Sequence, residues 1–324
     1  ARTIAINQRA ALNLDTSLEN ISRGDWLIDP SIIHPTTRLD VTINLLNPNL
    51  SIKAGAEYHL FIGTSHHIVS IRQLAKNGSF FQIKAQSAII AHYGDRFILR
   101  DPASQHTIGG GKVIDVFVPR KKRSSEERIR ALTASNQEDG LALKSLIETS
   151  PTGINLREFS IKRNLKSQKI EMFLKELRDK ELEYVRLEER ASKDAIILSN
   201  DYFKIYARRI MTLVENFHSA NVNVQGISEL SLSREAQLPA SHLFFNCVLQ
   251  VLLGKKLLNL TGTLLHLPSH KASLNIEERE FLTKVRPLLE RSGNIPPRTR
   301  ELVDLTGIPL RKLEIILKQI TRSG

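Results

Sequence analysis

The sequence predicts a mixed, multidomain protein in which a small β-barrel is followed by tandem α+β domains. Up to about residue 118, short strand-like runs alternate with turn signals, whereas beyond it the apolar residues recur at helical spacing. In addition, Glu158-Phe159 reappears as Glu301-Leu302 and Ile170 as Leu313, a constant shift of 143 positions. Such a shift indicates a repeated structural unit.

Six strand-like runs predict the barrel. Turn signals such as Asn47-Pro48-Asn49 and Gly94-Asp95 separate them, and this spacing is typical of a sandwich or a small barrel. The runs are 40–45, 57–62, 67–72, 81–85, 96–100 and 112–118.

Three glycines at 109–111 precede Lys112 and raise the question of a phosphate-binding loop. Such a loop requires an earlier glycine, where His106 stands, and a hydroxyl residue after the lysine, where Val113 stands. A strand-like run follows in place of a helix. We therefore interpret the glycines structurally, as positions where a barrel strand passes close to its neighbour.

The basic run at residues 120–123 ends the barrel pattern, and we place a linker at 119–125. The run, which consists of Arg120, Lys121, Lys122 and Arg123, is either a solvated linker or a polyanion contact.

Three helical copies follow the linker. In the first (126–199), a helix-turn-helix pattern precedes two strand-like runs, which together predict a winged helix. The second (200–274) shows the same order and a Thr261-Gly262 hairpin turn. The third (275–324) stops before any wing, and we expect a truncated copy and hence a piece of a longer protein.

The charge and composition limit the classes of partner that the protein could have. The net charge of +12, from 46 Lys plus Arg against 34 Asp plus Glu, favours polyanionic partners. No run approaches the roughly 18–20 apolar residues of a membrane span, so we expect a cytoplasmic, monomeric protein without a membrane partner. The single cysteine, Cys247, lies in an apolar helical run and excludes a disulfide framework.

A family resemblance emerges from residues 94–113. Gly94 to Arg100, Thr107 to Gly111 and Val113 resemble the third domain of translational GTPases of the elongation factor Tu type. The triple glycine together with serial winged helices resembles the bacterial selenocysteine-specific elongation factor. Residues 8–14 and 21–27 resemble the closing strands of that family's second domain. The resemblance thus assigns 1–29 to an incomplete second-domain barrel and 30–118 to the third-domain barrel.

The resemblance implies the partners. Selenocysteinyl-tRNA, the ribosome and a hairpin in the selenoprotein message are expected, and GTP with Mg²⁺ would belong to a GTPase domain that this chain lacks. No guanine-nucleotide motif, nucleophile with a base, or metal ligand set is evident, so we expect no enzyme activity, cofactor or metal in the chain itself. A DNA-binding winged-helix regulator is the alternative, but it leaves the barrel unexplained.

The candidate tRNA contacts surround the turn after residue 100. The resemblance places Asp101 against the tRNA T stem, although Pro102 removes a backbone N–H that elongation factor Tu has at this place. Arg96, Arg100, His106 and Lys112 surround the same turn and are candidates for phosphate contacts. Ordinary solvent-facing charges are the alternative for the two arginines. His66 and His67 are further RNA candidates, because a metal site would need a third ligand that we cannot place.

The message contacts are expected in the third copy. Its basic residues have fewer acidic neighbours than those of the first copy, for which we favour a spacer role. The candidates are Arg298, Arg300, Arg311 and Lys312.

Overall fold

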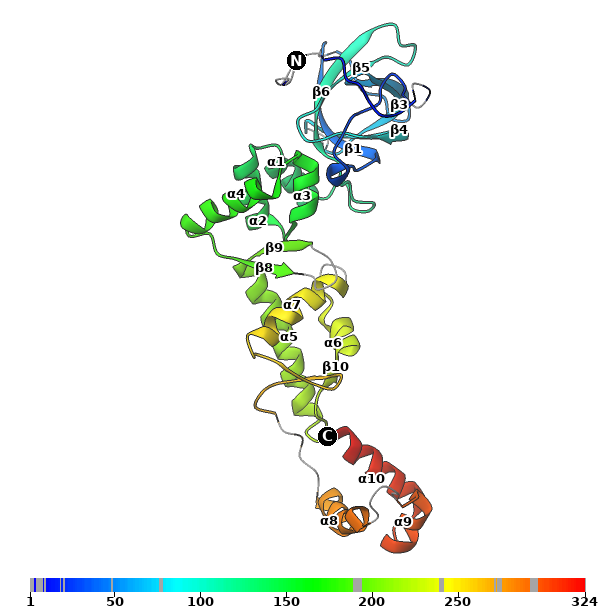
Figure 1. The fold of residues 1–324 in the computed structure, drawn as a ribbon, viewed down its shortest axis with the longest axis vertical. Coiled ribbons are helices and arrows are strands. Elements are labelled where there is room, and N and C mark those ends of the chain that lie inside the picture. Colours follow the sequence, from blue (N-terminus) through cyan, green and yellow to red (C-terminus); the bar gives the residue numbers. More distant parts are fainter. Residues whose placement is uncertain are drawn as a thin grey trace. The chain divides into compact units, whose positions relative to one another are not determined.

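The computed structural model describes residues 3, 8, 10–17, 19, 21–47, 49–75, 78–188, 194–238, 242–270, 272, 276–291 and 297–323. The chain divides into two compact units (Figure 1). The first unit comprises residues 1–149 and 155–181, and the second comprises 150–154 and 182–324.

The first unit contains a closed antiparallel barrel, as predicted. Its strands are β1 (Thr36–Leu45), β2 (Glu57–Ile62), β3 (Ser65–Gln73), β4 (Phe80–Ile89), β5 (Arg96–Arg100) and β6 (Thr107–Asp115). Their order around the barrel is β1-β4-β3-β2-β5-β6, and β6 pairs with β1 to close it. Alternate residues of each strand fill the interior, as Leu39, Leu60, Ile83 and Leu99 do at 0% exposure.

The glycines of β6 confirm the close approach of strands. β6 is longer than the predicted run 112–118, so the three glycines lie inside the strand, between β1 and β5. A Cβ on Gly110 would lie 2.7 Å from the carbonyl oxygen of Phe97, and one on Gly111 would collide with the carbonyl oxygen of Thr42. Only glycine fits such positions without backbone movement.

The predicted closing strands within residues 1–29 are wrong for the residues that the structure describes. Those before Thr36 contain a 3₁₀ helix, η2 (Pro30–Ile32), and no strand. The resemblance assigned these strands to a different barrel, and the closed barrel of β1 to β6 offers no free edge with which they could pair instead. The segment instead packs side chains, since a Cβ on Gly63 would lie 3.3 Å from the Trp26 ring. Its assignment to a second domain stays a prediction.

Four helices complete the first unit: α1 (Glu126–Ser135), α2 (Asp139–Thr149), α3 (Leu156–Arg163) and α4 (Ser167–Asp179). Asn155 caps α3 by accepting the N–H of Glu158, and Asn164 ends it in the left-handed region at φ 50°. Helix α4 then buries Ile170 and Leu174. The predicted first helix-turn-helix is therefore confirmed.

The second unit contains the hairpin that follows the first helix-turn-helix, and then the middle copy. Strands β7 (Ile154–Asn155), β8 (Tyr184–Glu188) and β9 (Ala195–Ser199) form one sheet, and β10 (Ile227–Ser228), β11 (Asn259–Thr261) and β12 (Leu264–His266) form another. The helices are α5 (Asn200–Ala220), α6 (Glu229–Ala236) and α7 (His242–Gly254). Leu187 and Leu198 of the first hairpin share one core with α5 and α7. The predicted turn at Gly262 has φ 60°.

The third copy consists of α8 (Ile276–Arg291), α9 (Thr299–Thr306) and α10 (Leu310–Ser323). Phe281, Val285, Leu302, Leu313 and Ile316 form its core. Leu302 and Leu313 are buried, as are Phe159 and Ile170 of the first copy, so the predicted repeat is confirmed. Within the described ranges, no helix is long and apolar enough to cross a membrane.

Candidate nucleic-acid interface

An aromatic patch lies on the outer face of β3, β2 and β5. In β2 the residues Tyr58, Leu60 and Ile62 point into the core, so His59 and Phe61 point outward. Across the strands, Phe61 pairs with His66 on one side and with Ile98 on the other, and His59 pairs with Arg100. We define the aromatic patch as His59, Phe61, His66, Ile98 and Arg100.

Ring contacts hold the patch together. His59 Nδ1 and His66 Nε2 lie 2.7 Å apart, and the His66 ring stacks on Phe61 with centroids 4.7 Å apart. The Arg100 guanidinium lies 5.5 Å from the centre of the Phe61 ring, and Ile98 is 51% exposed. Flat aromatic faces beside a guanidinium suit stacking on a base or ribose and a contact to phosphate.

The turn after β5 is held by Asp101. Its carboxylate accepts the backbone N–H groups of Gln105 at 2.8 Å and of His106 at 3.1 Å. These backbone hydrogen bonds, that of His106 first, hold the pKa of Asp101 below its usual value. Asp101 is thus an ionised anchor of the turn, and it lies 3.3 Å from the exposed His106 ring.

Arg96 and Lys112 face each other across β5 and β6. Lys112 Nζ lies 4.9 Å from the centre of the Tyr93 ring and donates to the Tyr93 hydroxyl at 3.4 Å. Arg96 is exposed, and no carboxylate of the described residues pairs with it. Arg96 thus lies at the start of β5, four residues before Arg100, with Lys112 opposite it on β6, so the expectation that they surround the turn after Arg100 is wrong for these two residues. Their positive charge lies on the outer face of β5 and β6, next to Ile98 of the aromatic patch.

His67 does not belong with His66, so their grouping was wrong. Neighbouring residues of a strand point to opposite faces, and His67 pairs with the inward-facing Leu60. Its ring contacts the hydroxyls of Ser65 and Ser87 at 3.1 Å each. Burial lowers the pKa of His67.

Three residues of the patch were missed: His59, Phe61 and Ile98. The available signal was the alternation in Glu57-Tyr58-His59-Leu60-Phe61-Ile62, which places an aromatic residue on each face of β2. An outward phenylalanine is informative, because solvent-facing strand positions are usually polar.

The basic linker divides into two parts. Arg123 is half-buried, and its guanidinium donates to the carbonyl of Arg120 at 3.0 Å and to the Gln82 side chain at 3.3 Å. Arg120, Lys121 and Lys122 are exposed. Arg123 therefore has a structural role, and the other three remain candidates for a polyanion contact.

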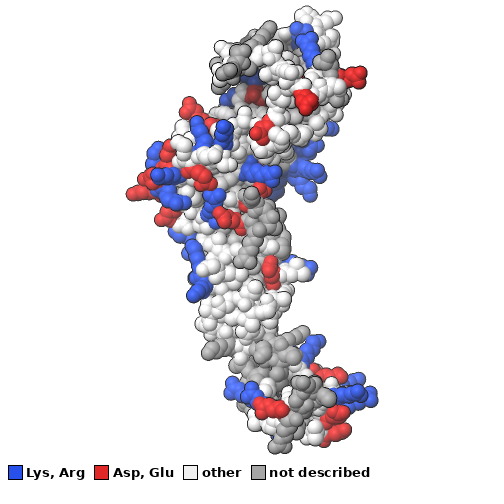
Figure 2. Space-filling view, viewed as in Figure 1, with Lys and Arg blue, Asp and Glu red and all other residues white. Residues whose placement is uncertain are grey.

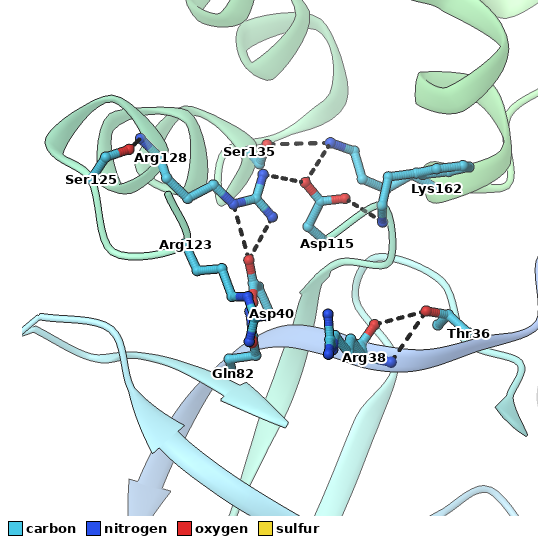
Figure 3. Close-up of polar contacts among 11 residues, drawn as sticks. Thr36, Arg38, Asp40, Gln82, Asp115, Arg123, Ser125, Arg128, Ser135 and Lys162 are labelled. Carbon is cyan, nitrogen blue, oxygen red and sulfur yellow. Dashed lines mark hydrogen bonds and ion pairs between the residues drawn. The ribbon is translucent and has the colours of Figure 1, made fainter. Parts of the chain in front are cut away.

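A buried charge network joins the barrel to the helices of the first unit (Figure 3). Arg128 of α1 contacts the carboxylate of Asp40 at 2.5 Å and that of Asp115 at 3.0 Å. Lys162 of α3 lies 3.6 Å from the Asp115 carboxylate. Asp40 and Asp115 are 0% and 4% exposed, so both depend on these cations. We call these four residues the joint.

The ionisation of the joint follows from burial and charge. Burial raises the pKa of Asp40, with Arg128 opposing the rise. Burial also opposes ionisation of Asp115, but Lys162 and Arg128 outweigh it and hold its pKa below the usual value. Burial lowers the pKa of Lys162. Lys162 and Arg128 thus favour the ionised form of Asp115 in spite of its burial.

The third copy presents its predicted cations at helix starts. Arg298 and Arg300 lie at the beginning of α9, and Arg311 and Lys312 lie in the first turn of α10. All four are exposed. The second helix of a helix-turn-helix is the one that enters a groove, and its first turn is where contacts to nucleic acid concentrate.

The fold and these surfaces define a class of protein: a small closed antiparallel barrel followed by helix-turn-helix modules with short hairpins. Residues 36–120 match the family model described as "Selenocysteine-specific elongation factor, beta-barrel domain". Over these residues the chain is thus similar to the barrel of the selenocysteine-specific elongation factors.

Comparisons with individual proteins extend this similarity beyond the barrel. The chain is 24% identical to the selenocysteine-specific elongation factor of Haemophilus influenzae (93% of this chain, 48% of the relative) and 25% identical to that of Escherichia coli (99% and 50%). It thus spans about half the length of the curated relatives it matches.

The fold has a counterpart in a solved structure. That crystal structure, of the bacterial selenocysteine-specific elongation factor EF-Sec, matches 94% of this chain and 45% of its own with a TM-score of 0.56 and 16% identity. None of these relatives supports the DNA-binding alternative.

Proposed function

We propose that the barrel binds a stem of selenocysteinyl-tRNA, within a longer elongation factor that acts at the ribosome. The observation that carries this proposal is the aromatic patch with Arg96 and Lys112 beside it, on a barrel that matches this family's barrel. Arg96, Arg100 and Lys112 meet phosphates, and Phe61 with His66 offers a platform to a ribose or a base. Asp101 keeps the adjoining turn in shape.

The proposal assigns no chemistry to this chain. GTP and Mg²⁺ belong to the GTPase domain expected in the rest of the protein, and the chain itself holds no cofactor. Within the described residues no group of three or more His, Cys, Asp or Glu residues is placed to hold a metal ion. The protein is expected to act as a monomer in the cytoplasm, where translation occurs. Measurable GTP turnover by the purified chain would contradict the proposal that the GTPase activity belongs to another domain.

tRNA binding tests the barrel. In Phe61→Ala and Arg100→Gln variants the Kd for selenocysteinyl-tRNA should rise about tenfold, since one stacking contact contributes about 1–3 kcal/mol. The matched control is Met172→Ala with Lys175→Gln, both exposed on α4. Circular dichroism confirms that the variants fold. If the patch variants bind as tightly as the control, the patch is not the tRNA site.

For the third copy we propose a phosphate contact to the message hairpin through Arg298, Arg300, Arg311 and Lys312. Binding by this chain should be weak, show little sequence preference and fall steeply with salt, because phosphate contacts release counterions. Titration of the hairpin and a scrambled hairpin at two salt concentrations tests it. A hundredfold preference at the higher salt, about 2.7 kcal/mol, would mean that base-specific recognition lies within residues 126–324.

A further inference from the structure

A second charged surface lies on the outer face of β1, β4 and β3. Arg38 pairs with Lys84, Lys84 pairs with Ser70, and Arg72 pairs with Gln82. Inward-facing neighbours such as Leu39, Ile71 and Ile83 are buried, so these polar side chains point outward. We define the cationic face as Arg38, Arg72 and Lys84 together with the exposed linker residues Arg120, Lys121 and Lys122.

Two carboxylates on this side of the barrel are buried and paired with cations. Asp40 pairs with Gln82 across the strands, but it is fully buried under Arg128 and accepts a hydrogen bond from Gln82 at 3.0 Å. Asp115 is likewise buried between Arg128 and Lys162. The joint thus leaves neither of these two carboxylates on the surface. Glu57 remains exposed at the edge of the face, where it pairs with Ser70 and accepts a hydrogen bond from Gln86 at 2.7 Å.

The linker cations are held at the edge of this face. Arg123 donates to the side chain of Gln82, whose strand also carries Lys84, and to the carbonyl of Arg120. Figure 3 shows Arg123 beside Gln82, with Arg38 on β1 next to Asp40. Basic side chains gather where the barrel meets the linker (Figure 2). The linker charges therefore add to those of the strands.

We propose that the cationic face is a second RNA-binding surface, which holds the phosphate backbone of an RNA duplex. Among the described residues of β1, β3 and β4 no large apolar side chain is exposed. Protein interfaces depend on buried apolar or aromatic anchors, whereas phosphate recognition needs only convergent cations. The chemistry of this face therefore fits a nucleic-acid backbone better than an acidic protein.

The cationic face and the aromatic patch occupy different parts of the barrel, although both include strand β3. His66 lies near the start of β3 and Arg72 near its end, and β4 is three positions from β5 in the closed order β1-β4-β3-β2-β5-β6. One barrel is thereby able to contact two RNA segments at once. This inference goes beyond the proposed tRNA contact and does not depend on it.

The test measures binding of the whole chain to a blunt 20-base-pair RNA duplex by fluorescence anisotropy. Substitution of Arg38, Arg72 and Lys84 by Gln should raise the Kd about tenfold and reduce the slope of log K against log salt by about two to three. The control replaces Lys175, Lys180 and Lys204 by Gln, which changes the charge equally at exposed positions within α4 and α5 or at the end of α4. Its Kd should stay within about twofold, because charges remote from the bound phosphates contribute little.

A variant that is expected to bind more tightly distinguishes a lost contact from misfolding. Ser70→Lys adds a cation between Lys84 and Glu57 and should tighten duplex binding about threefold. Equal losses in the triple variant and its control, or an unchanged affinity in Ser70→Lys, would overturn the proposal. Unchanged RNA binding with lost binding of a 20-residue poly-glutamate peptide would assign the face to an acidic protein instead. The tRNA result with Phe61→Ala bears on the proposed function alone.

Discussion

The first and third copies share a scaffold but use their basic residues differently. Phe159 and Ile170 correspond to Leu302 and Leu313, and all four are buried. Even the helix ends agree, because Asn164 and Gly307 occupy the same place and both adopt positive φ. The shared apolar pattern therefore produces the same helix-turn-helix fold in both copies.

The difference lies at two positions near the end of the first helix. In the first copy these are Lys162 and Arg163, which are 8% and 6% exposed and serve the contact with the barrel. In the third copy they are Leu305, which is 59% exposed, and Thr306. Two basic residues thus fix the module to the barrel in the first copy, whereas the corresponding positions of the third copy carry no charge.

The largest effect should come from the joint. Arg128→Ala leaves the carboxylates of Asp40 and Asp115 buried with one cation fewer, which should lower the free energy of unfolding of the first unit by about 3–5 kcal/mol. Urea unfolding measures it. Arg130→Ala on the same helix and Arg300→Ala in the third copy are exposed and should each cost less than about 0.5 kcal/mol. Equal costs in all three would remove the contrast between the copies.

Arg163 should give the next largest effect. Its guanidinium donates to Asp139 at 2.5 Å and to the carbonyls of Ser135 and Gln137, and it lies 3.9 Å from the centre of the Tyr93 ring. Arg163→Ala should cost about 2–3 kcal/mol in urea unfolding, because it leaves buried acceptors unpaired.

The matched substitution sharpens this comparison. Thr306→Ala, at the corresponding place of the third copy, removes a hydroxyl that bonds only its own helix and should cost less than about 1 kcal/mol. Arg163→Lys should recover little, since an ammonium cannot reproduce the planar fork. Full recovery by lysine would show that charge alone matters there.

These residues also mark where sequence analysis succeeded and where it stopped. Strand alternation and helical spacing are local, so the barrel, the repeat and the glycine strand were predictable. The joint was not predictable, because Asp40, the partner of Arg128, lies 88 positions away in the sequence. A charged side chain on a helix normally faces solvent. The separation of His66 from His67 needed only the alternation of a strand. The basic character of the tRNA side was predictable, but Phe61 became visible only once its strand neighbours were placed.

The middle copy provides a pH-dependent contrast. His218 is buried and stacks on His270 at 3.6 Å, and within the described part neither of its ring nitrogens has a hydrogen-bond partner. Burial, then the neighbouring His270 and His266, lowers the pKa of His218 to about 4.

The sign follows from proton binding. An unfolded histidine protonates near pH 6.5, whereas His218 in the folded protein does so near pH 4. This contribution to stability is therefore complete above about pH 6.5 and should fall by about 2 kcal/mol as the pH drops to 5. Unfolding of His218→Phe, measured at pH 7.5, 6 and 5, should lack this part of the pH dependence. An unchanged profile in the variant would assign it to other groups.

The smallest effects should come from the helix ends that the two copies share. A Cβ on Gly307 meets nothing within 4 Å, so any cost of substitution there comes from its φ of 69° and not from packing. Because asparagine tolerates the left-handed region and alanine does so less well, Gly307→Asn should cost a few tenths of a kcal/mol and Gly307→Ala about 1 kcal/mol. By the same reasoning, Asn164→Gly should stay within about 0.5 kcal/mol of the parent. Urea unfolding of the three variants checks the order, and if asparagine at 307 costs more than alanine, the two positions are not equivalent caps and the correspondence between the copies ends at their apolar cores.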